Sequence, residues 1–126
     1  MNSSDRKPVA LITGVGPGTG SALVRRFVTG GYRVAMLARD AERLAGLEAE
    51  FPDARAFACD VSDSAAVAEV LARVRAELGT PAVLIHNAVA GGRASFLDMD
   101  PSLLERGFQV NVMALLHLAR ALAPDM

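Results

Sequence analysis

A glycine-dense segment at residues 13–20 carries the clearest chemistry in this sequence. It reads Thr-Gly-Val-Gly-Pro-Gly-Thr-Gly and stands between an apolar run, Val9–Ile12, and a helical pattern that begins near Ser21. Glycines let the backbone turn tightly and approach a ligand, and the first N–H groups of a helix, with the positive end of its dipole, attract an anion. A strand, a glycine turn and a helix in that order therefore predict a pyrophosphate-binding site.

The spacing Thr13-Gly14-x-x-x-Gly18-x-Gly20 resembles the T-G-x-x-x-G-x-G motif of the short-chain dehydrogenase/reductase (SDR) family. The resemblance implies an NAD(P)-binding Rossmann domain over residues 1–126 and an oxidoreductase that interconverts a carbonyl and an alcohol. The alternatives are a glycine turn without a ligand and a methyltransferase, whose sites usually carry an acid where this chain has Thr13. The residues of the turn expected to bind the cofactor are Gly14, Gly16, Pro17, Gly18, Thr19 and Gly20.

The end of the second apolar run sets the expected coenzyme preference. NAD-binding folds place an acid there to bind the adenosine ribose, whereas this chain has Ala38 followed by Arg39. A guanidinium can pair with a 2′-phosphate, which an acid would repel. Asp40 precedes a helical pattern and is expected to cap it. We therefore expect NADP(H) to be preferred over NAD(H). The alternative is that Arg39 is a solvated surface arginine. The chain also departs from NADP-preferring relatives, which often carry a second basic residue where it has Pro17.

Two further segments resemble coenzyme-binding motifs of the SDR family. Asp60 and Val61 follow the third apolar run, where the family uses an Asp to bind the adenine amino group and the next residue to pack on the ring. An acid at this point is also an ordinary helix cap. Asn87 and Ala88 match the N-N-A-G motif after the fourth run, in which His86 replaces the first Asn and is expected to be structural.

Asn111, in Gly-Phe-Gln-Val-Asn-Val, matches the Asn that the SDR family places in its fifth helix to hold a water of the proton relay. The resemblance makes Asn111 the expected catalytic residue; the alternative is a polar residue in a helix bend. The family's Ser and Tyr-x-x-x-Lys have no counterpart here, because the single tyrosine, Tyr32, has no Lys four residues later. We expect a truncated product that is inactive alone, with a non-catalytic nucleotide-binding module or pseudoenzyme as the alternative.

Alternating strands and helices must position these residues. Short apolar runs separated by helical patterns imply parallel strands joined by right-handed crossovers, in three α/β/α layers. We expect an incomplete, doubly wound Rossmann-type sheet with strand order 3-2-1-4. The predicted strands are Val9–Thr13, Arg33–Ala38, Ala54–Ala58 and Ala82–His86, and the helical patterns cover 19–29, 41–51, a third stripe capped by Ser62 or Asp63, and 100–123 with a break near Gly107.

Composition limits the other classes of function. A chain of 126 residues with 52% hydrophobic and 21% charged residues suits one globular domain. A net charge of −1 argues against a nucleic-acid partner, and no apolar run is long enough to span a membrane. The polar N-terminus has no apolar signal core, which predicts a cytoplasmic protein. A single cysteine, Cys59, excludes an internal disulfide and a cysteine-rich metal site, and is expected to be a small buried residue.

The last helical pattern suggests a homo-oligomer. Its apolar stripe resembles the helix that the SDR family uses in subunit pairing, so homodimerisation is a hypothesis. The same family resemblance implies a small carbonyl or alcohol substrate. The stripe comprises Val112, Leu115, Leu116, Ala119 and Leu122.

Overall fold

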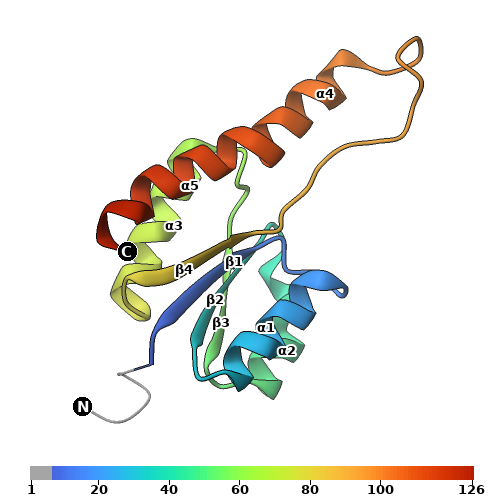
Figure 1. The fold of residues 1–126 in the computed structure, drawn as a ribbon. Helices are drawn as coiled ribbons and strands as arrows, with labels where there is room; N and C mark the ends of the chain where they lie inside the picture. The colour runs from blue at the N-terminus through green and yellow to red at the C-terminus, as the bar shows by residue number, and fades with distance from the viewer. Residues whose placement is uncertain (1–6) are drawn as a thin grey trace.

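The computed structural model describes residues 7–126, and its centre is a four-stranded parallel sheet (Figure 1). Along the sheet the strands stand in the order β3-β2-β1-β4, each parallel to its neighbour, which confirms the predicted order. The predicted bounds are also confirmed, except that the fourth strand begins one residue earlier, at Pro81. The strands are β1 (Val9–Thr13), β2 (Arg33–Ala38), β3 (Ala54–Ala58) and β4 (Pro81–His86).

Helices cover both faces of the sheet and complete the three predicted layers (Figure 1). One face carries α1 (Thr19–Thr29), the 3-10 helix η2 (Ala41–Leu44) and α2 (Ala45–Glu50). The other face carries α3 (Ser64–Glu77) and α5 (Ala114–Leu122). The remaining helical segments are α4 (Pro101–Phe108), the π-helical turn η3 (Gln109–Met113) and the 3-10 helix η4 (Ala123–Asp125).

The central strands are buried on both sides, which explains their nearly continuous apolar sequence. Every residue of β1 is buried; Leu11 packs toward α3 and α5, whereas Ala10 and Ile12 pack toward α1 and α2. The helices supply the matching apolar faces. The predicted stripe of the third helical pattern is confirmed as buried: Val67, Val70, Leu71, Val74 and Leu78.

Acidic side chains cap the N-termini of three helical segments. Asp40 accepts the N–H of Glu42 at 3.1 Å, and Asp100 accepts that of Ser102 at 2.9 Å. Asp63 accepts the N–H groups of Ala65 and Ala66, so Asp63 rather than Ser62 caps α3. These bonds satisfy N–H groups that have no partner inside the helix.

The last helical pattern is interrupted close to Gly107, where the sequence predicted a break. It is divided into α4, η3 and α5, and the irregular part is the π-helical turn Gln109–Met113. The apolar stripe predicted for this region is divided as well, because Leu122 is fully buried whereas Leu115 and Leu116 are exposed. No helix in the described part of the chain combines the length and apolar character needed to cross a bilayer.

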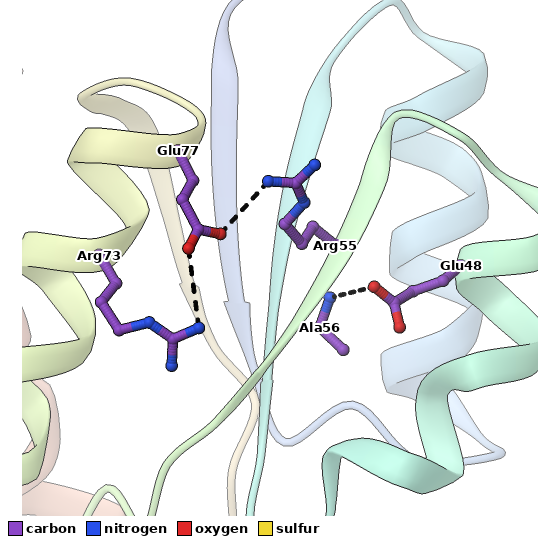
Figure 2. A network of polar contacts seen from close by, with 5 residues as sticks. All are labelled: Glu48, Arg55, Ala56, Arg73 and Glu77. Carbon is purple, nitrogen blue, oxygen red and sulfur yellow. Dashed lines mark hydrogen bonds and ion pairs between the residues drawn. The ribbon is translucent and has the colours of Figure 1, made fainter.

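Charged groups protect the β3 edge of the sheet (Figure 2). The carboxylate of Glu48 accepts the N–H of Ala56 at 3.1 Å, and Glu77 on α3 pairs with Arg55 at 3.3 Å and with Arg73 at 3.7 Å. An occupied N–H and a charged side chain discourage another strand from pairing at this edge.

Candidate functional site

A cleft of about 1540 Å³ opens where the carboxyl ends of the four strands meet α1 and α4. The sheet of a doubly wound fold binds ligands at this edge, where strand order reverses between β1 and β4. The volume exceeds the roughly 300–1,000 Å³ of most small-molecule pockets, which suits an extended ligand. Of the residues expected to bind cofactor, the cleft is lined by Gly14, Gly16, Pro17, Gly18, Arg39, Asp60, Val61 and Ala88.

The glycines of the turn after β1 serve two different purposes. Gly14 has φ +67°, and a Cβ there would lie 2.5 Å from the backbone of Ala88. A Cβ on Gly20 would lie 2.6 Å from the carbonyl oxygen of Gly14, so this glycine lets α1 pack against the turn. Around Gly16 and Gly18 a Cβ would meet nothing within 4 Å. The outer glycines therefore permit close packing, while the inner two leave the backbone open toward the cleft.

The start of α1 adds anion-binding capacity beside these open glycines. Gly18 is its N-cap and makes no side-chain capping bond, and the first turn contains no acidic residue. Thr19, in the same turn, is exposed and is not part of the cleft lining. The hydroxyl of Ser21, which sequence reasoning missed, donates to the carbonyl of Gly16. The helix thus presents its positive dipole end to the cleft without a competing carboxylate.

Four arginines line the cleft, namely Arg25, Arg39, Arg43 and Arg106, and only Arg39 was expected there from the sequence. Arg39 follows β2, is exposed, and makes no ion pair with any residue from 7 to 126. Arg43 lies 3.3 Å from Asp40, and Arg25 lies 3.1 Å from Glu50. Arg39 is therefore the guanidinium that an incoming anion meets without displacing a carboxylate.

Asp60 follows β3 and lines the cleft as a carboxylate. Its Oδ1 accepts the hydroxyl of Ser62 at 2.7 Å and the N–H of the same residue at 3.0 Å. The hydroxyl bond from Ser62 lowers the pKa of Asp60 most; burial opposes it, and the N–H of Ser62, Arg106 and Arg39 lower that pKa further. Because Asp63 caps α3, Asp60 is not that helix's cap. Val61 beside it is buried.

The turn after β4 is tied to β1 through a buried hydroxyl. Thr13 is completely buried, and its Oγ1 accepts the N–H groups of Asn87 and Ala88, both at 3.1 Å. The side-chain amide of Asn87 donates to the carbonyl of Gly14 at 3.1 Å. Asn87 thus fixes the glycine turn rather than lining the cleft. His86 bonds to Thr13 and to the carbonyl of Val110, which supports its expected structural role.

Asn111 lies in η3 and binds the loop that follows β4. Its Oδ1 accepts the N–H of Ala90 at 2.9 Å, and its Nδ2 donates to the carbonyl of Ala90 at 3.0 Å. A Cβ on Gly107 would lie 3.3 Å from the same carbonyl, so α4 also packs closely there. The amide of Asn111 therefore holds the strand-to-helix loop in place, and a relay role remains a prediction.

Several lining residues carried no signal in the sequence. Leu103, Arg106 and Val110 reach the cleft from α4 and η3, far along the chain from the glycine turn. Arg106 lies 3.7 Å from Asp60.

Cys59 also lines the cleft. Burial raises the pKa of its thiol to about 11, and the nearby carboxylates of Asp60 and Asp63 add to the rise. The thiol is therefore protonated at neutral pH, which fits a small packing residue rather than a nucleophile.

Comparison with known proteins gives a consistent result. The family model described as short chain dehydrogenase matches residues 8–126. Epidermal retinol dehydrogenase 2 of Mus musculus is 36% identical over 98% of this chain and 43% of its own length. D-erythrulose reductase of Gallus gallus is 32% identical over 93% of this chain and 46% of its own length. The chain thus spans less than half of these relatives.

Solved structures agree with this match. A short-chain dehydrogenase from Streptomyces avermitilis superposes with a TM-score of 0.89 at 35% identity, covering 95% of this chain and 45% of the other. A metagenomic short-chain oxidoreductase in complex with NADP gives 0.86 at 36% identity, over 98% and 57%. The 3-ketoacyl-(acyl-carrier-protein) reductase of Brucella melitensis, complexed with NADH, gives 0.86 at 30% identity, over 93% and 49%. Similar folds therefore bind either coenzyme.

Proposed function

The chain belongs to the short-chain dehydrogenase family, and on that premise we propose that its cleft binds NADP(H) in preference to NAD(H). The coenzyme supplies a hydride, and the reaction class is the interconversion of a carbonyl and an alcohol. Gly16, Gly18 and the start of α1 would hold the pyrophosphate. The carboxylate of Asp60 would accept the adenine amino group while Val61 packs on the ring.

The observation that carries the NADP(H) preference is the state of Arg39. This guanidinium lines the cleft and makes no ion pair within residues 7–126. The other lining arginines, Arg25, Arg43 and Arg106, each face a carboxylate. A 2′-phosphate would therefore meet a guanidinium that no carboxylate of residues 7–126 holds in an ion pair. The ribose of NAD(H) has only hydroxyls there, and no acid occupies the position of Ala38 to accept them.

Calorimetric titration of the chain with NADPH and with NADH tests this preference. A charged hydrogen bond is worth about 1.5–3 kcal/mol, so Arg39→Ala should weaken NADPH roughly 10- to 100-fold and leave NADH nearly unchanged. Arg120→Ala, at an exposed arginine outside the cleft lining, is the matched control and should change neither. Gly18→Val should weaken both coenzymes, because its side chain fills the open space at the turn. Equal losses in Arg39→Ala would refute the preference.

For residues 1–126 alone we propose binding without turnover. Hydride transfer to a carbonyl needs a proton donor within hydrogen-bond reach. The single tyrosine, Tyr32, packs edge-on against Phe27 at 5.0 Å between ring centroids and is outside the cleft lining. The same arrangement supports the second candidate, a nucleotide-binding module. The test is NADPH oxidation measured with a panel of aldehydes and ketones. The rate should equal the rate without protein, and any faster turnover would overturn the proposal.

Homodimerisation is proposed through the exposed part of the last helical region. Val112, Leu115 and Leu116 are each between 43% and 48% exposed. Apolar side chains gathered on one helix face favour association in water. Light scattering at micromolar protein should give a dimer mass, and Leu116→Glu should reduce it to the monomer mass. A monomer mass for the unmodified chain would contradict this proposal.

A further inference from the structure

A chain of part-buried hydrogen bonds runs from the buried hydroxyl of Thr13 in β1 through His86 to the π-helical turn. The Oγ1 of Thr13 lies 2.9 Å from Nδ1 of His86, and Nε2 of the same ring lies 2.8 Å from the carbonyl oxygen of Val110. One imidazole therefore spans the distance between the strand that precedes the glycine turn and the helix that covers the cleft.

The hydrogen-bonding capacity of Thr13 determines the direction of this chain. A threonine hydroxyl has one proton to donate and two lone pairs that accept. Both lone pairs are used, because Oγ1 accepts the N–H groups of Asn87 and Ala88. The hydroxyl proton must then go to Nδ1 of His86, which consequently carries no hydrogen. The ring proton is on Nε2, the position that can donate to a carbonyl.

The π-helical turn explains why the carbonyl of Val110 accepts a bond from a side chain. In a regular α-helix this carbonyl would accept the N–H of Ala114, four residues on. Here Ala114 donates to Gln109 instead, five residues back. The irregular turn thereby withdraws the usual partner of Val110, and Nε2–H of His86 supplies another.

The same turn carries Asn111, the next residue along the chain. Its amide makes the paired bonds to Ala90 that hold the loop after β4. We propose that His86, as the neutral Nε2–H tautomer, is the positioning residue that fixes this turn against the sheet and so places Asn111. Any effect of His86 on catalysis rests on the proposed function, in which Asn111 holds a water of the proton relay. The tautomer of His86 and its hydrogen bond to Val110 do not rest on it.

Two measurements on the coenzyme-free chain test the proposal. Nitrogen-15 NMR of the His86 ring should identify Nε2 as the protonated nitrogen and Nδ1 as the bare one. Hydrogen exchange of the Ala90 N–H then reports the hold of Asn111 on the loop. His86→Asn keeps polar atoms near Thr13 but is too short to reach Val110, and exchange should become about fivefold faster, as expected for one lost hydrogen bond.

His86→Gln is the conservative variant, because its amide nitrogen reaches about as far as Nε2, and it should restore slow exchange. His117→Asn, at a half-buried histidine on α5, is the matched control and should leave exchange unchanged. A proton on Nδ1 would overturn the proposal, as would His86→Asn with unaltered exchange or His86→Gln with exchange as fast as His86→Asn. None of these readouts needs bound coenzyme, so failure of the proposed function would leave them intact.

Discussion

Residues 7–88 and residues 89–126 differ in how much of their apolar surface is buried. In the first region the strands and the inner faces of α1, α2 and α3 pack into two continuous clusters on either side of the sheet. In the second region α5 buries one face, and much of the remaining apolar surface meets solvent. The large hydrophobic side chains left exposed in the described part of the chain are Val89, Phe96, Leu97, Leu103, Leu104, Phe108, Val112, Leu115, Leu116 and Met126.

Because of this difference, coenzyme binding and self-association are expected to depend on different regions of the chain. The glycine turn, Arg39 and Asp60 belong to the first region, whose apolar groups are already covered. The second region adds only Val89–Gly91, Leu103, Arg106 and Val110 to the cleft lining. It also exposes large apolar side chains, which favour contact with another protein surface. Coenzyme binding is therefore expected to depend on the first region and self-association on the second.

The largest expected contrast comes from removing one phenylalanine in each region. Phe57 is 1% exposed in the core beneath α3, so Phe57→Ala should lower the free energy of unfolding by about 3–5 kcal/mol. Phe96 is 88% exposed, and Phe96→Ala should change it by less than about 0.5 kcal/mol. Urea denaturation measures both. Comparable losses would show that the second region is packed as tightly as the first.

A smaller contrast is expected from adding a methyl group to one glycine in each region. Gly14→Ala must adopt φ +67° and places its Cβ 2.5 Å from the backbone of Ala88, which should cost about 2–4 kcal/mol. Gly92→Ala meets nothing closer than a Leu103 methyl at 3.8 Å and should cost less than about 0.5 kcal/mol. Thermal unfolding followed by circular dichroism would compare them. An unchanged melting temperature in Gly14→Ala would mean that the turn can relax away from Ala88.

The smallest effect is expected where Arg106 of the second region meets Asp60 of the first. The folded-state pKa of Asp60 is lowered, so its carboxylate stabilises the fold above the ordinary value of 3.8 and loses that contribution as pH falls through the folded-state pKa. Asp60 is 43% exposed, so solvent screening keeps the effect below about 1 kcal/mol. The difference in unfolding free energy between the unmodified chain and Asp60→Asn should be present at pH 7 and shrink below pH 3.8. A difference that grows on acidification would contradict the assigned sign.

Much of the fold could be predicted because its signals are local. The strand bounds follow from short apolar runs, and the caps at Asp40, Asp63 and Asp100 depend on atoms two or three residues away. The roles of Gly14 and Gly20 could be predicted only as turn positions. Their closeness to Ala88 and to the turn itself requires the packed sheet. Periodicity predicted an apolar stripe in the last helix, but it could not say that Leu122 meets the sheet while Leu115 and Leu116 remain exposed.

The sequence by itself determined a parallel α/β sheet with a glycine turn between β1 and α1, because hydrophobic periodicity and backbone freedom are properties of neighbouring residues. Only the tertiary structure decided that Arg39 makes no ion pair within residues 7–126, that the break in the last helix is a π-helical turn, and that His86 supplies the missing partner of Val110. The reason is distance along the chain. Thr13 and His86 are 73 residues apart, His86 and Val110 are 24 apart, and hydrogen bonds over such separations exist only after the strands have paired.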